Sequence, residues 1–244
     1  MLIHDMTSRE GEAPDAVELT PLSSYEGTLS SRVYLSLKDA ILSLAYQPGQ
    51  ILRKGDICDQ LGISRSPVSE AVTRLAADGL VNVVPQAGTF VARFSMEEIR
   101  EGAFLREALE LAAVEQVAST ITKSQVTLLR RNLRVQQAFV EDLDVQGFYK
   151  LDTEMHNLIL GFTNYRRLAA MAETSWLQVN RARQLILPNP NRVSDTLEEH
   201  RAIVDALEAR DPEGARQATK FHLSQLLRHL EAVERDRPDL FAQS

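Results

Sequence analysis

A chain of 244 residues, of which 44% are hydrophobic and 25% charged, is long enough for two domains with separate cores, and this composition excludes collagenous and disordered classes. It contains no apolar stretch long enough to span a membrane, and its single cysteine, Cys58, cannot form an intramolecular disulfide, so a cytoplasmic protein is expected. The net charge of -7 argues against a nucleic-acid binder, but residues 30–93 hold seven Lys and Arg against five acidic residues and form the one positive block of the chain.

The N-terminal part of the chain begins with an irregular segment. Residues 1–28 lack hydrophobic periodicity and contain acidic residues and two prolines, which predicts a flexible tail. Apolar residues then recur at helical spacing from Leu29 to Leu44, and the sequence QPGQ ends this helix. A short second helix over residues 55–61 ends at Gly62.

A third helix and a hairpin follow. The helix opens at Ser66 or Pro67 and ends at Gly79, because Pro is tolerated at the first helical position and Gly commonly ends helices. The β-branched runs LVNVV and TFVAR flank the turn sequence PQAG and predict a two-stranded hairpin. Helix, turn, helix and hairpin in this order predict a winged helix-turn-helix domain over residues 29–93, whose second motif helix enters the major groove of DNA.

The start of this second motif helix carries candidate DNA contacts. A helix N-terminus offers free N–H groups and a positive dipole end to phosphates, and Arg65 precedes it closely enough to reach a base edge or a phosphate. Ser66 and Ser69 are small enough for close approach and supply hydroxyl donors. Gly88 at the hairpin tip also permits close approach, because it has no side chain.

The sequences LKDAILSLAYQPGQIL, LGISRSPVSEAVTRLAADGLV and PQAGTFVA resemble the N-terminal domain of GntR-family bacterial transcriptional regulators. The resemblance implies that Arg65 and Arg74 contact DNA and that Gly88 lies at the wing tip. Where relatives usually carry Arg in PVREAL this chain has Ser69, so the operator sequence is not implied. Arg53 is expected to contact a phosphate, with a solvated surface charge as the alternative.

Beyond residue 94 only helical patterns occur. The capping sequence SMEE predicts a helix to about Ser119, and further helices are predicted to start near Ser124, Val145, Asn164, Thr196 (in a second capping sequence, TLEE) and Asp211. The predicted fold is therefore mainly α: three helices and a β-hairpin form the winged helix-turn-helix, and an all-α bundle of six helices follows over residues 94–236. Residues 237–244 are predicted to be a C-terminal tail.

Polar residues interrupt the apolar stripes of three of these helices. In FYKLDTEMHNLI, Asp152 and His156 lie one turn apart on the face that should be buried, and His200 and His222 hold similar positions on two other helices. Separate burial costs roughly 2 to 7 kcal/mol for each unpaired neutral polar group and more for a charge, whereas convergence on one cation removes most of that cost. This donor set suits Zn²⁺, with Ni²⁺ or Mn²⁺ as alternatives. Each histidine taken singly is more often a hydrogen-bonded core residue.

This pattern resembles the FCD effector-binding domain of one large GntR subfamily over about residues 96–236. The segments DTEMHNLI, EHRAIVDAL and ARQATKFHLSQL imply that these four residues are its metal ligands, and six helices resemble the VanR-type branch. Arg106, in FLREALELAA, is expected to bind an effector carboxylate beside the metal, with an i,i+4 ion pair to Glu110 as the alternative. Asn180, Arg181 and Arg183 are further candidates for the pocket, none of them singled out.

Together these patterns predict a ligand-responsive transcriptional regulator. A homodimer is expected to place two recognition helices on a palindromic operator in double-stranded DNA, and to repress transcription until a small-molecule effector, expected to be a carboxylate, binds. One alternative is a metalloenzyme, since three His and one Asp with open positions can activate water, but no nucleophile or general-base motif accompanies them and no enzyme is expected. The other alternative is a purely structural metal.

Overall fold

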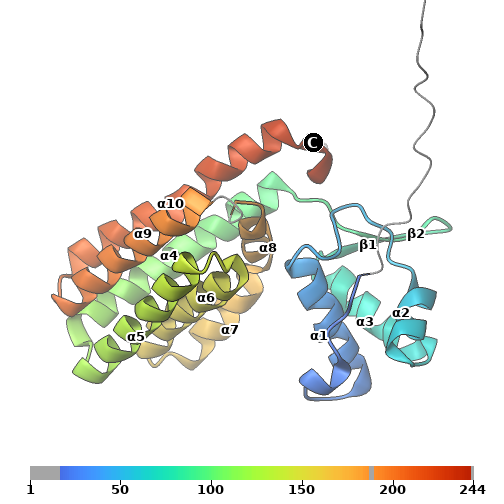
Figure 1. The fold of residues 1–244 in the computed structure, drawn as a ribbon, viewed down its shortest axis with the longest axis horizontal. Helices are drawn as coiled ribbons and strands as arrows, with labels where there is room; N and C mark the ends of the chain where they lie inside the picture. Colours follow the sequence, from blue (N-terminus) through green and yellow to red (C-terminus); the bar gives the residue numbers. More distant parts are fainter. Residues whose placement is uncertain (1–16, 187–189, 243–244) are drawn as a thin grey trace, which may run out of the picture.

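The computed structural model describes residues 17–186 and 190–242, which form two domains joined by a short linker, residues 92–95 (Figure 1). The N-terminal domain contains η1 (Leu22–Ser24), α1 (Leu29–Leu42), α2 (Lys54–Leu61), α3 (Arg65–Ala77), β1 (Val81–Val84) and β2 (Gly88–Val91). The helical domain contains α4 (Met96–Thr120), α5 (Lys123–Glu141), α6 (Val145–Phe162), α7 (Arg166–Ser175), α8 (Leu177–Ile186), α9 (Pro190–Glu208), α10 (Pro212–Asp236) and η2 (Pro238–Leu240). A mainly α fold with a winged helix-turn-helix ahead of a helical domain is thereby confirmed.

The N-terminal domain packs its three helices around one apolar core. Thr28 caps α1 by accepting a hydrogen bond from the Ser31 N–H, and Gly62 ends α2 in the left-handed conformation that favours glycine. The antiparallel hairpin pairs Val81 with Val91 and Val84 with Gly88. Fully buried side chains from α1 and α3 fill the core: Val33, Leu37, Ile41, Val68 and Leu75. The apolar stripes seen in the sequence therefore face one another here.

Both predicted tails pack against the folded domains over their described residues. Residues 17–28 lie on the N-terminal domain, where Leu19 is buried and the Ser36 hydroxyl donates to the Thr20 carbonyl at 2.8 Å. The absence of hydrophobic periodicity did not predict this packing, because the irregular segment is held by the apolar side chains of Val17, Leu19 and Leu22 and by side-chain hydrogen bonds to its carbonyls. Residues 1–16 of the predicted tail lie outside the described residues.

The C-terminal segment pairs with the linker between the domains. The Phe94 N–H donates to the Leu240 carbonyl at 3.0 Å, and the Ala242 N–H donates to the Phe94 carbonyl at 2.8 Å. The rings of Phe94 and Phe241 are buried with centroids 5.6 Å apart. The chain past α10 is therefore a packed part of the linker region rather than a tail as far as residue 242.

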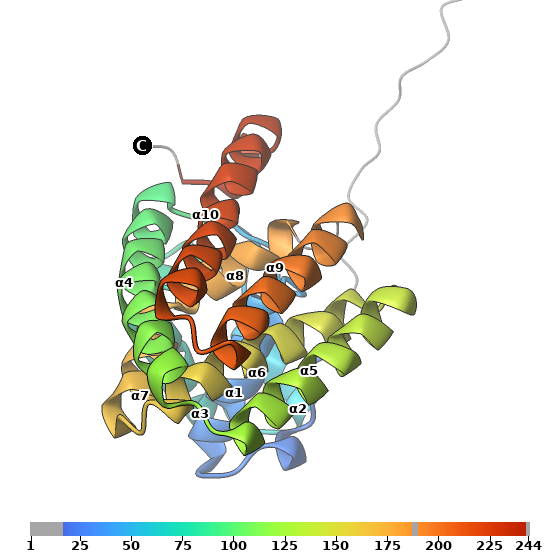
Figure 2. The ribbon, with the colours of Figure 1, turned by 90° about the vertical axis from the view of Figure 1, so that its left-hand side faces the viewer.

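In the helical domain α4 packs beside α10, and α5 lies beside α6 and α9 (Figure 2). One apolar cluster joins α4, α5, α6, α9 and α10, and a second joins the linker to α4, α8 and α10. No helix within the described ranges is both long and apolar enough to cross a membrane.

The described helical domain has one helix more than predicted. The helix expected from Asn164 begins at Arg166 and is divided at Trp176 into α7 and α8. Ala172, Trp176 and Val179 are all buried in one cluster, so the apolar spacing continues across the break and does not reveal it. Seven helices lie between residues 96 and 236 in the described part, and the count that suggested the VanR-type branch does not hold.

The start predicted for α9 was also wrong. This helix begins at Pro190, so Thr196 lies inside it and donates its hydroxyl to the Arg192 carbonyl at 2.7 Å. Thr can also form this i to i−4 bond inside a helix, so TLEE did not mark a helix start here. The consequence is functional, because the extra turns bring Arg192 and Thr196 beside His222.

Candidate functional site

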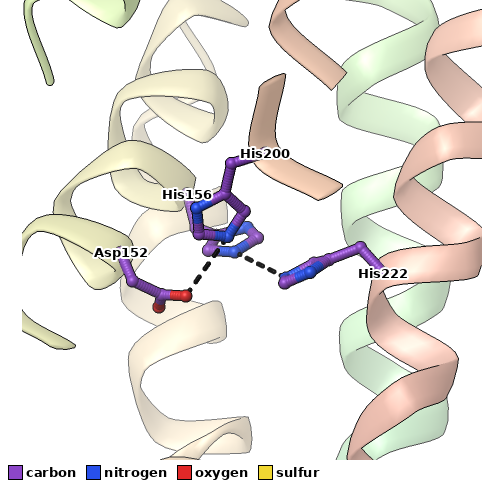
Figure 3. Close-up of side chains that lie close together, drawn as sticks. All are labelled: Asp152, His156, His200 and His222. Atoms are coloured by element: carbon purple, nitrogen blue, oxygen red, sulfur yellow. Dashed lines mark hydrogen bonds and ion pairs between the residues drawn. The ribbon is translucent and has the colours of Figure 1, made fainter. Parts of the chain in front are cut away.

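The four polar residues predicted on apolar stripes meet inside the helical domain. Asp152 and His156 come from α6, His200 from α9 and His222 from α10, and all four are buried. Their side chains point toward a common centre (Figure 3), and each offers one ligand atom within 4.8 Å of the others. The structure thus brings together residues separated by up to 70 positions in the chain.

A second layer of residues orients the three imidazole rings. In each ring Nδ1 faces an oxygen acceptor, so Nδ1 carries the proton and the Nε2 lone pair is directed to the centre. The three bonds are His156 to Glu110 (2.6 Å), His200 to Gln136 (2.8 Å) and His222 to Glu199 (2.7 Å).

The tautomer of His200 is held by a chain of amides that starts at a backbone carbonyl. Asn132 Nδ2 donates to the Leu151 carbonyl at 3.0 Å, and Gln136 Nε2 donates to Asn132 Oδ1 at 2.6 Å. This orients the Gln136 amide so that Oε1 faces His200. Because Oε1 can only accept a hydrogen bond, His200 Nδ1 is the donor. The Nε2 atom of His200 therefore presents a lone pair to the centre.

This arrangement leaves acceptors facing acceptors. His200 Nε2 lies 3.2 Å from Asp152 Oδ1, and both atoms are buried without a hydrogen-bond partner among the described residues. The Nε2 atoms of His156 and His222 lie 3.2 Å apart. Such a set is unfavourable by itself and fits a cation at the centre, and one carboxylate with three imidazoles is a donor set that Zn²⁺ and related metals take.

The protonation states of these groups agree with ligation. Burial lowers the pKa of His200, and it lowers the pKa of His222 to about 3, so both rings are neutral at pH 7. Burial alone raises the pKa of Asp152, but the charge of Arg183 outweighs it and holds that pKa well below its usual value. Metal binding requires these deprotonated forms.

Three buried arginines surround the cluster, each paired with a carboxylate. Arg183 pairs with Asp152, Arg106 Nε donates to Glu110 Oε1 at 2.6 Å, and Arg192 binds both carboxylate oxygens of Glu199 at 2.6 and 2.8 Å. The same arginines line a cavity of ≈ 20 Å³ together with Thr196, His222 and apolar side chains of α8 and α10. Arg106 therefore forms the ion pair given above as the alternative and also faces the cavity.

Several of these partners were not predicted. Among the three candidates on α8, the structure directs Arg183 to Asp152 and Arg181 to the Ala92 carbonyl near the linker. A buried polar role for Gln136 could have been predicted, because it lies four residues after Asn132 on the buried face of α5. Glu199 precedes His200 in sequence but binds His222, which sequence spacing does not indicate.

The predicted DNA contacts lie on the outer face of the N-terminal domain. Arg65 and Ser66 are exposed at the start of α3, Ser69 is half-buried, and no side chain caps the free N–H groups of this helix. Arg74 lies further along α3, against α1, with its guanidinium 4.0 Å from the Tyr34 ring centroid. The helix start is thus open to an anion, while Arg74 is partly engaged within the domain.

The wing forms a second part of this face. Arg53 and Gly88 line one groove of ≈ 530 Å³ between the start of α2 and the hairpin turn, and Lys54, which was not predicted, lines it with them. Gly88 has φ +128°, a conformation rarely adopted by other residues, whereas a Cβ there would meet Ile51 and Phe90 at ordinary contact distance. Its backbone conformation, rather than crowding, requires glycine.

A winged helix-turn-helix ahead of a helical domain is the architecture of a DNA-binding regulator, and here the helical domain contains a buried cluster of one Asp and three His. Comparison with known families agrees: residues 29–91 match the family of bacterial regulatory proteins, gntR family, and residues 101–225 match the FCD domain. The chain belongs to the GntR family and carries an FCD domain. It is a DNA-binding transcriptional regulator and not an enzyme.

Individual relatives support this assignment. The HTH-type transcriptional repressor RspR of Escherichia coli K12 is 28% identical over 215 residues, covering 88% of this chain and 94% of its own. An HTH-type transcriptional regulator from an unstable DNA locus of Streptomyces ambofaciens is 32% identical over 210 residues, covering 86% and 88%. Among solved structures, a GntR regulator from Rhodococcus sp. RHA1 has a TM-score of 0.73 at 26% identity over 83% of this chain and 97% of that one. McbR/YncC of E. coli has a TM-score of 0.71 at 24% identity, covering 87% and 99%, and shows the same fold.

Proposed function

We propose that this chain is a cytoplasmic, metal-containing repressor that binds a palindromic operator as a homodimer and is controlled by a small anionic effector. The observation that carries the proposal is the convergence of three Nε2 lone pairs and one carboxylate oxygen, each held by a second residue. A relative named as a repressor, RspR, supports the direction of control.

For DNA binding, the start of α3 is the proposed contact. Its uncapped N–H groups suit a phosphate, and the exposed Arg65 and Ser66 beside them suit a base edge or a second phosphate. Arg53, Ser69, Arg74 and Gly88 complete the proposed surface. A dimer would place two such helices about one DNA turn apart, roughly 34 to 36 Å, on the two halves of the operator.

For metal binding, Asp152, His156, His200 and His222 would hold Zn²⁺, with Ni²⁺ or Mn²⁺ as alternatives. The bound ion would supply a positive charge and open positions for an anionic ligand. Each acidic residue around the site already pairs with an arginine, so a divalent ion leaves the region positive. A carboxylate effector is therefore favoured, with Arg106 as its second contact.

The cavity beside the cluster sets a condition on effector binding. Its volume of ≈ 20 Å³ is enough for about one water molecule. An organic acid therefore enters only if lining side chains move, and Arg106, Arg183 and Arg192 are the long side chains available for it. Effector binding is thus coupled to movement of these arginine side chains.

The metal content of purified protein tests the site. We expect about one metal ion per chain in wild type and at least tenfold less in His200→Ala. His229→Ala is the matched control, because His229 is on α10 outside the cluster and bonds the Gln225 carbonyl. Equal metal content in wild type and His200→Ala would contradict the proposed site.

The effector is tested by thermal denaturation of the Zn²⁺-loaded protein with acetate, succinate and citrate. A ligand that binds the folded state must raise the melting temperature. We expect at least one acid to do so in wild type but not in Arg106→Ala with equal Zn²⁺ content. If no acid shifts either protein, the metal is structural and the proposed effector class is wrong.

A further inference from the structure

Helix α8 contacts both the buried cluster and the DNA-binding domain. It carries Arg181 and Arg183, and residues two apart on a helix point about 200° from each other. Accordingly Arg183 pairs with Asp152 in the cluster, while Arg181 Nη2 donates to the Ala92 carbonyl, directly after β2, at 2.6 Å. One short helix therefore joins the ligand cluster to the end of the wing.

Two more contacts attach α8 to the N-terminal domain. Gln178 Nε2 donates to the Gly79 carbonyl, which follows α3, at 3.1 Å, and Leu177 packs against the core of α1 and α3. Val179, near the start of α8, and Ile186, at its end, belong to the second apolar cluster of the helical domain. Figure 1 shows α8 between the helical bundle and α1.

Arg181 is poorly explained as a stabilising residue. Its side chain is fully buried, its Nε and Nη1 atoms have no hydrogen-bond partner among the described residues, and burial lowers its pKa to about 10. Its guanidinium lies 4.5 Å from the centroid of the Phe94 ring, at the linker. A buried charge with one neutral acceptor is unfavourable compared with an apolar side chain of the same length.

We propose that α8 transmits the state of the buried cluster to the DNA-binding domain, with Arg183 as its contact to Asp152 and Arg181 as its contact to the linker. Asp152 offers Oδ1 to the centre and Oδ2 to Arg183, so a change at the centre reaches α8 through one carboxylate. A rigid helix then passes a displacement to Ala92. The inference rests on the proposed function, because it assumes that ligation at the centre is the regulated event.

Hydrogen exchange of the backbone in residues 80–94 tests this transmission without operator DNA. In wild type we expect Zn²⁺, compared with chelator, to change exchange in this segment about threefold or more. In Arg181→Met the change should fall below about 1.5-fold although Zn²⁺ uptake is equal. Arg167→Met, at an exposed position of α7, is the matched control and should behave as wild type.

The opposite result overturns the proposal: an equal response to Zn²⁺ in wild type and Arg181→Met would leave the C-terminal segment that pairs with Phe94 as the route. Failure of wild type to take up Zn²⁺ would instead refute the metal in the proposed function. The same exchange measurement on Asp152→Asn in chelator then tests the coupling between the cluster and residues 80–94 without a metal. If α8 transmits the change, Asp152→Asn alters hydrogen exchange in residues 80–94 when Arg181 is present and leaves it unaltered in the Arg181→Met variant. An equal effect of Asp152→Asn in both proteins refutes transmission through α8.

Discussion

The proposed DNA-binding face, at the start of α3, and the buried cluster are built in opposite ways. On the proposed DNA-binding face, Arg65 and Ser66 are exposed neighbours at one helix start. In the cluster every candidate ligand is buried and held by a partner from another helix, as His200 is held by Gln136 of α5. Loss of one residue should therefore remove one contact on the DNA-binding face but leave unpaired polar groups in the cluster.

The largest effect is expected from Arg183→Met, which leaves the Asp152 carboxylate buried without its cation. In chelator this change should lower the free energy of unfolding by about 3 to 5 kcal/mol, measured by urea denaturation. Zn²⁺ should restore much of the loss, because it neutralises the same carboxylate. A decrease in the free energy of unfolding below about 0.5 kcal/mol, the usual range for surface changes, would show that the cluster tolerates single changes as well as the proposed DNA-binding face.

Removal of the metal should have the next largest effect. At a free Zn²⁺ concentration 100 times the Kd, the bound ion stabilises the folded chain by about 2.7 kcal/mol over the chelated form. The two forms are compared by denaturant titration in wild type and in His222→Gln. The variant should show no gain from Zn²⁺, and a gain equal to that of wild type would remove His222 from the site.

Gln136→Leu tests the second layer alone. Without the acceptor for Nδ1, His200 is no longer held in one tautomer, and Zn²⁺ affinity should fall about 10- to 100-fold in a competition titration with a chelating dye. Gln137→Leu, the adjacent and half-buried residue, is the control and should retain wild-type affinity. Equal losses in both variants would mean that α5 acts only through packing.

The smallest effect is expected for Arg65→Ala. Operator affinity should fall about tenfold, because one exposed contact is lost, with an unchanged melting temperature. Arg131→Ala, exposed on α5, serves as the control for the lost positive charge. An affinity equal to that of wild type would contradict the assignment of the α3 start to DNA.

Local patterns were sufficient where function depends on consecutive residues. Gly62 and Gly79 lie just past the ends of α2 and α3, Pro67 lies in the first turn of α3, and the hairpin turn is only residues 85–87, so the winged domain was predictable. Local patterns did not predict the helix break at Trp176 or the true start of α9. Apolar spacing continues through Trp176, and the Thr196 hydroxyl is satisfied inside α9 rather than at its start.

What the sequence determined by itself was which side of each helix is buried. Asp152, His156, His200 and His222 followed from that, because a polar residue on an apolar stripe has few favourable environments. The tertiary structure decided which buried groups face each other: it placed Glu110, Gln136 and Glu199 behind the rings and turned Arg183 and Arg181 toward different domains. Periodicity describes the rotation of a residue about its own helix axis, whereas these contacts depend on the height and angle at which separate helices pack.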